Sequence, residues 1–210
     1  MGRTSSTGIG AEIFGLADFI PPRVGKGLIW THLHGEQPLY ARRLTGDEVR
    51  ARIDNYWCPY HDAIAAAYDR IHGEFGRIYH VNCHSMLARG NAYDPDGETT
   101  RPDFVISNHD GKSCSPEFLE LVVEYLHTEN IHVAINDPYK GAELTRRYAD
   151  PAVQRHSLQI EINRRLYMDE MAIEKSSNFT TLHTLEHDAF KMAYVSCSIL
   201  LILRKFVVAD

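Results

Sequence analysis

Short β-prone runs alternate along this chain with stretches in which apolar residues recur at helical spacing. Runs bounded by polar or turn-forming residues predict strands over residues 77–85, 103–107, 131–137 and 157–163. Helical spacing covers residues 45–71, 115–127, 166–174 and 180–203. Such alternation is typical of an α/β fold, in which helices cover both faces of the sheet. The pattern therefore predicts a three-layer α/β/α arrangement.

Two of the predicted helices carry recognisable start signals. Thr45 is followed three residues later by Glu48, which together make a capping box. Ser115 and Pro116 suit the N-cap and first position of another helix. Pro59 lies within the first helical stretch, where a missing N–H favours a break.

The ends of the chain differ from its middle. Residues 1–26 are dense in Gly, Pro and Ser, so we expect an irregular segment followed by a single domain over residues 27–210. The apolar run 195–203 falls short of the ~20 residues needed to span a bilayer. We therefore expect a buried helix or strand there, with no membrane anchor.

Composition narrows the class of protein further. The chain has 210 residues, of which 44% are hydrophobic and 24% charged, so it can bury a core without disulfides. A net charge of -6 argues against a nucleic-acid partner, since phosphate binding needs clustered Lys and Arg. No secretory leader or CxxC pair is present, so we expect a cytoplasmic protein with reduced thiols. The thiols are those of Cys58, Cys83, Cys114 and Cys197.

Glu161 is the most informative residue of the predicted strands. It alternates with Ile160 and Ile162, so Glu161, Gln159 and Asn163 share one face. That face is either a wet outer surface or the wall of a cleft. In a cleft, apolar surroundings would raise the pKa of the carboxyl and suit it to general-base work.

Histidines raise the question of a metal, because the chain has 12 of them. His84 follows the first predicted strand and is either a structural histidine or a ligand. A catalytic zinc needs three protein ligands and an open position, and His84 supplies one. His32, His34 and Glu36 form the nearest group that could supply others.

Two adjacent arginines, Arg146 and Arg147, follow a glycine-containing loop. A guanidinium can clamp a carboxylate through paired hydrogen bonds, although solvated surface charge is the commoner role. Together with His84 and Glu161 on the predicted strands, these arginines indicate an α/β protein and are compatible with a hydrolase.

Several strings of the sequence, in the same order, resemble the N-formylglutamate amidohydrolase family over about residues 27–175. They are the segment 35–64 with its GEQPLY start, NCHSM at 82–86, RPDFVISNHDGKSC at 101–114, NDPYKGAELTRRYADP at 136–151 and HSLQIEINRRLYMDE at 156–170. The last string is the most specific of them.

The resemblance implies a zinc-carboxypeptidase-like fold, with a mixed sheet between helical layers and zinc at the strand ends. It implies hydrolysis of N-formyl-L-glutamate to formate and L-glutamate, late in histidine breakdown. His84 matches a zinc ligand, and Glu161 matches the base that activates water and protonates the leaving amine. Arg146 matches an arginine suited to a substrate carboxylate, while Asn136 and Asp103 lie in matching motifs as candidate substrate-binding residues.

Two departures from the family pattern leave other hypotheses open. Asn82 stands where the family often has Asp. The family takes two further zinc ligands from an N-terminal segment, whereas residues 1–26 contain no His, and Glu12 and Asp18 are their only acids. An inactive, truncated member that keeps the fold is one alternative, and an amidohydrolase for another N-acyl amino acid is a second. The oligomeric state stays open.

Overall fold

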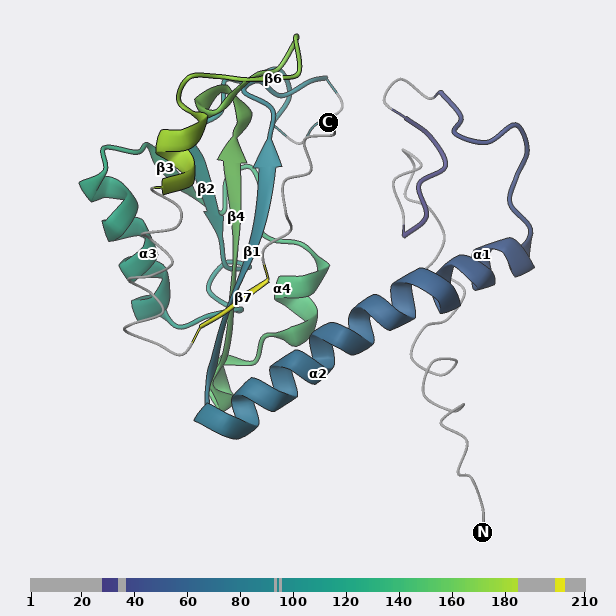
Figure 1. The fold of residues 1–210 in the computed structure, drawn as a ribbon, viewed down its shortest axis with the longest axis horizontal. Helices are drawn as coiled ribbons and strands as arrows, with labels where there is room; N and C mark the ends of the chain where they lie inside the picture. The colour runs from purple at the N-terminus through teal and green to yellow at the C-terminus, as the bar shows by residue number, and fades with distance from the viewer. Residues whose placement is uncertain (1–27, 34–36, 93, 95, 185–198, 203–210) are drawn as a thin grey trace. The chain divides into compact units, whose positions relative to one another are not determined.

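A computed structural model describes residues 28–33, 37–92, 94, 96–184 and 199–202 of the chain (Figure 1). The chain divides into two compact units, Met1–Asp62 and Ala63–Asp210, which are described separately below. The expected boundary between residues 26 and 27 lies outside the described residues and stays a prediction.

In the first unit, the chain enters α1 (Gly46–Arg52) through the predicted capping box. The Glu48 backbone N–H donates to Thr45 Oγ1 at 3.3 Å, and the Thr45 N–H donates to the Glu48 carboxylate at 2.8 Å. Each side chain thus satisfies a backbone donor that the first helical turn leaves unpaired.

The predicted break at Pro59 is wrong, because helical structure runs through it. A π-helical turn, Ile53–Trp57, precedes Pro59, and α2 (Cys58–Phe75) follows without interruption. The Cys58 N–H reaches back to the Ile53 carbonyl, five residues earlier. This shift in hydrogen-bond register accommodates a residue that has no N–H to donate.

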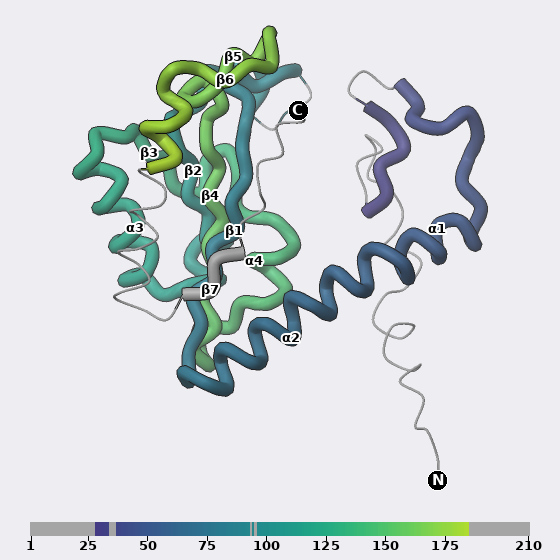
Figure 2. The backbone as a smooth tube through the Cα atoms, in the orientation of Figure 1, coloured from purple at the N-terminus to yellow at the C-terminus, as the bar shows by residue number. Residues whose placement is uncertain are grey.

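The second unit is built on a mixed sheet with strand order β3-β2-β4-β1-β7 (Figures 1 and 2). Its strands are β1 (Ile78–Met86), β2 (Phe104–Ser107), β3 (Val133–Ile135), β4 (Arg155–Asn163) and β7 (Ile199–Ile202). β2 runs antiparallel to β4, and the other neighbours are parallel. The predicted mixed sheet is confirmed.

Helices cover both faces of this sheet, as the α/β prediction requires (Figure 1). On one face, α3 (Pro116–Thr128) packs Phe118 and Leu126 against an apolar cluster from the strands. On the other face, Ile64, Tyr68 and Ile71 of α2 form a smaller cluster with Ile78 and with Leu144 of α4 (Glu143–Tyr148).

The helix predicted over residues 166–174 is wrong. A short 3₁₀ turn, Arg164–Leu166, leads instead into a hairpin of β5 (Met168–Asp169) and β6 (Glu174–Lys175). The Asp169 carboxylate accepts from the N–H groups of two residues that follow it, which closes the turn. Aspartate favours such turns because it competes for backbone donors that a helix would use.

The helix predicted over residues 180–203 is correct only in part. Residues 179–184 are helical, residues 185–198 lie outside the described ranges, and β7 is a strand. β7 pairs in parallel with β1, from Tyr79 opposite Ile199 to Asn82 opposite Ile202. Periodicity alone leaves the apolar run 195–203 ambiguous between helix and strand, and hydrogen bonding to β1 makes residues 199–202 a strand.

Neither a membrane-spanning helix nor a disulfide occurs among the residues that the structure describes. No helix there combines the length and apolar character needed to cross a bilayer. Cys58, Cys83 and Cys114 are free thiols, and Cys197 lies outside the described residues.

Candidate active site

Polar side chains form successive pairs between β1 and β4 on one face of the sheet. His80 Nδ1 lies 2.7 Å from Ser157 Oγ, and Asn82 Nδ2 donates to Gln159 Oε1 at 3.5 Å. The residues of each pair also stand opposite each other in the parallel register. The next pair along this face brings the two predicted site residues together.

That pair is His84 and Glu161. Their backbones stand opposite each other, and His84 Nδ1 lies 4.0 Å from Glu161 Oε1. The Glu161 side chain is 9% exposed and that of His84 is 30% exposed. The structure therefore brings these two candidate residues together, and the alternative of a wet outer face at Glu161 is wrong. Their catalytic and metal-binding roles stay predictions.

Burial controls the protonation of Glu161. It raises the pKa of the carboxyl to about 7, against the opposing effects of the Gln159 hydrogen bond and of the Arg101 and Arg164 charges. Removing an ionised carboxylate from water favours its neutral form. A group with a pKa close to neutral can both accept and return a proton, as a general acid–base catalyst must.

Gln159 orients Glu161 and connects it to the segment that precedes α4. Its Nε2 donates to Glu161 Oε1 at 2.9 Å, while its Oε1 accepts from the Ala142 N–H at 2.7 Å. Gln159 is itself buried, with 3% of its surface exposed. The alternation of β4 placed Gln159 on this face but could not reveal its partners.

Arg101 is a buried cation whose charge acts on Glu161. Its guanidinium pairs with Asp94 at 2.9 Å and Asp96 at 2.8 Å, and its Cζ lies 5.2 Å from the centre of the Tyr139 ring. The Asp96 hydrogen bond is the largest cause of a pKa raised above the ordinary arginine value. Sequence reasoning missed Arg101, because its partners come from a loop whose path no periodicity predicts.

Arg146, the predicted carboxylate ligand, lies on α4. Its side chain is 71% exposed and forms an ion pair with Glu143, which also pairs with Arg147 at 2.6 Å. These contacts hold two arginines on one carboxylate. The role of Arg146 in substrate binding stays a prediction.

Asn136 and Asp103 connect loops at the ends of strands. The Asn136 side chain accepts from the Asn108 N–H at 2.9 Å and donates to the Asn108 side chain at 2.8 Å. Asp103 forms an ion pair with Arg165 and accepts from the His132 N–H at 3.0 Å. These bonds link the segments after β2 and β3 and the segments before β2 and β3. A substrate role for Asn136 or Asp103 stays a prediction.

A zinc ion at His84 would need two further protein ligands close by. Among the described residues, no three His, Cys, Asp or Glu side chains converge as ligands. His84 is therefore a single candidate ligand, and His32 lies in the first unit with its Nδ1 2.9 Å from Thr31 Oγ1. His34 and Glu36 lie outside the described residues. The described side chains do not complete a catalytic zinc site, which takes three protein ligands.

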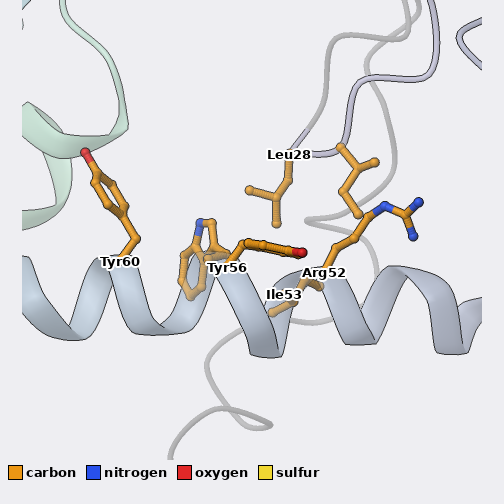
Figure 3. Close-up of a pocket in the computed structure, with 7 residues that line it drawn as sticks. Leu28, Arg52, Ile53, Tyr56 and Tyr60 are labelled. Carbon is orange, nitrogen blue, oxygen red and sulfur yellow. The ribbon is translucent and has the colours of Figure 1, made fainter. Parts of the chain in front are cut away.

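The first unit contains a hollow of about 460 Å³ (Figure 3). Its walls are apolar and aromatic apart from one guanidinium, and consist of Leu28, Ile29, Arg52, Ile53, Tyr56, Trp57 and Tyr60. This lining contains no His or carboxylate side chain, unlike the His84–Glu161 pair between β1 and β4.

The fold and this pair together define an α/β protein with adjacent His and Glu side chains on one face of a mixed sheet. The model of the family described as N-formylglutamate amidohydrolase matches residues 13–168. The chain belongs to the N-formylglutamate amidohydrolase family. The family model thus begins before the expected start at about residue 27 and ends before the expected end at about residue 175.

Individual relatives agree with the family assignment. The N-formylglutamate deformylase of Pseudomonas putida is 32% identical over 151 residues, which are 69% of this chain and 54% of the relative. That of Pseudomonas aeruginosa is 30% identical over 152 residues, with shares of 70% and 55%. The crystal structure of N-formylglutamate amidohydrolase from Ralstonia eutropha JMP134 is similar with a TM-score of 0.75 and 40% identity, covering 82% of this chain and 62% of that one. The chain spans about half the length of the curated relatives it matches.

Proposed function

We propose that this chain hydrolyses the formamide of N-formyl-L-glutamate to formate and L-glutamate. The observation that carries the proposal is the His84–Glu161 pair, with Nδ1 4.0 Å from Oε1 on the buried face of adjacent strands. Family membership supports the substrate, since the relatives are named for N-formylglutamate.

Glu161 acts as the proton carrier in the proposed reaction. Its carboxylate takes a proton from the water that attacks the formyl carbon, and later donates this proton to the nitrogen of the departing amine. The carbon–nitrogen bond breaks, giving formate and the amino group of glutamate. Gln159 holds Glu161 Oε1 at 2.9 Å, so that the base does not rotate away between the two transfers.

Replacing Glu161 by Gln tests this role. We expect kcat to fall about 10²- to 10⁴-fold, the usual contribution of a positioned acid–base group, while the fold is retained. Glu124→Gln, an exposed site on α3, is the matched control and should keep kcat unchanged. Formate release is measured with a coupled assay. Formate release by wild type no higher than the rate without protein would establish an inactive member of the family and reject the proposal. Equal release above that rate by wild type and Glu161→Gln would reject the role of Glu161.

Zinc remains part of the proposal, with His84 as one ligand. The remaining ligands would have to come from outside the described residues, and the proton transfers above do not pass through the metal. Elemental analysis of the zinc-loaded protein should give about one zinc per chain for wild type and less for His84→Ala. Absence of zinc from the loaded wild-type chain would remove the metal from the proposal.

The acyl group that the chain accepts, its cellular location and its pathway need separate tests. N-Formyl-L-glutamate and N-acetyl-L-glutamate are compared as substrates, and preference for the acetyl compound would favour another N-acyl amino acid. A part in histidine breakdown is proposed from the family resemblance, and a cytoplasmic location from the cysteine pattern. Cell fractionation and growth of a deletion strain on histidine test them.

A further inference from the structure

Arg164 follows β4 directly and reaches across to β1. Its Nε donates to Ser85 Oγ at 3.1 Å, and Ser85 is the residue after His84 on β1. The charge of Arg164 also lowers the pKa of Glu161, which places the guanidinium within electrostatic reach of the base. Arg164 is partly buried.

The backbone that carries Arg164 is tightly held. Asn163 has no exposed surface, and its Nδ2 donates to the carbonyls of Arg101 at 3.2 Å and Pro102 at 2.9 Å. Asn163 Oδ1 accepts from the Arg165 N–H at 3.2 Å, which begins the 3₁₀ turn. The start of the Arg164 side chain is therefore fixed, and Ser85 fixes its Nε.

The charge of Arg164 has no carboxylate partner among the described residues. The other arginines of this region each have one: Arg101 pairs with Asp94 and Asp96, Arg146 and Arg147 pair with Glu143, and Arg165 pairs with Asp103. Arg164 makes only the contact of Nε with Ser85 within the described part of the chain. Its two terminal nitrogens thus remain available as a parallel pair of donors.

Two parallel N–H donors on a planar cation match the two oxygens of a carboxylate. We propose that Arg164 binds a carboxylate of the substrate, namely the one on the carbon that bears the scissile amide nitrogen. This inference rests on the proposed function. Arg164 lies at the carboxyl ends of β4 and β1, as Glu161 and His84 do, and its charge reaches Glu161. In the proposed reaction Glu161 protonates the amide nitrogen, and this carboxylate is the nearer of the substrate's two to that nitrogen.

Two formamides that differ only in the relevant carboxylate test the assignment. N-Formyl-L-glutamate carries the carboxylate next to the amide, and 4-formamidobutanoate lacks it but keeps the distal one. In Arg164→Ala we expect KM for N-formyl-L-glutamate to rise at least tenfold with a smaller change in kcat. KM for 4-formamidobutanoate should change less than twofold, and Arg164→Lys should recover only part of the loss, because an ammonium lacks the planar pair of donors.

Binding measured without turnover separates this inference from the proposed function. Calorimetry with L-glutamate should show weaker binding to Arg164→Ala than to wild type. Arg155→Ala is the matched control, because Arg155 is at the opposite end of β4 and pairs with Asp69. Binding that depends on Arg164 without formate release would reject only the proposed function. Turnover with an unchanged KM in Arg164→Ala, or equal losses for both substrates, would reject only the role of Arg164.

Discussion

His84 and Glu161 stand opposite each other in neighbouring parallel strands, and their side chains meet on one face, with Nδ1 4.0 Å from Oε1. Strand register sets this relationship. A slip of one residue in β4 would turn Glu161 towards the apolar cluster under α3 and bring Ile160 or Ile162 to the polar face. The backbone ladder of the sheet, more than any loop, therefore holds His84 and Glu161 together.

Gln159→Leu should impair catalysis more than folding. The change removes the donor to Glu161 Oε1 and the acceptor of the Ala142 N–H. Hydrogen bonds to charged groups contribute about 1.5–3 kcal/mol, so we expect kcat to fall roughly 10- to 100-fold. Steady-state kinetics and thermal unfolding are measured on the same samples. The prediction fails if the lost activity equals the loss of folded protein.

His80→Asn should make the free energy of unfolding depend less on pH in the acidic range. Burial lowers the pKa of His80 to about 4, and among the described residues its Nε2 has no hydrogen-bond partner. Between the ordinary pKa of about 6.5 and the folded value of about 4, the unfolded chain binds a proton that the folded chain does not. Falling pH in this window therefore reduces wild-type stability, by roughly 3 kcal/mol in total.

Urea denaturation from pH 4 to pH 7 measures this effect. His80→Asn retains a polar atom for Ser157 but cannot gain the proton, so its free energy of unfolding should vary less with pH. His127→Asn, an exposed site on α3, is the control. An identical slope for wild type and His80→Asn would contradict the prediction.

Gly90→Ala should destabilise the loop around Arg101. A Cβ at Gly90 would lie 2.0 Å from the Gly97 carbonyl oxygen and 3.0 Å from Arg101 Nη2. Because the closest atom belongs to the backbone, the loop must move, and we expect a loss of about 1–3 kcal/mol in the free energy of unfolding. Gly73→Ala in α2 meets nothing within 4 Å, so it should gain up to about 1 kcal/mol. Similar denaturation midpoints for the two variants would disprove the predicted clash.

Strand alternation and capping signals were enough to predict much of this fold. The strand around Glu161, the helix begun by Ser115 and the capping box at Thr45 all appear in the structure. The hairpin that replaces the helix predicted over residues 166–174 was missed, because turn chemistry at Asp169 outweighs apolar spacing.

The part of the candidate site that lies on a single strand could be predicted from the sequence. Alternation in β4 places Glu161 and Gln159 on one face, and pairing with β1 then brings in His84. Arg101 and Arg164 could not be found in this way. Arg101 matters because Asp94 and Asp96 pair with it, and Arg164 because no described carboxylate does. Both facts depend on how distant loops fold together.

The two faces of β4 also suggest where to modify the protein for practical use. Leu158, Ile160 and Ile162 belong to the apolar cluster that also contains Phe118 and Leu126 of α3, whereas the polar pairs occupy the reverse side of the sheet. Protein engineers can therefore seek heat resistance by exchanging side chains between α3 and the sheet, with the reactive groups left as they are.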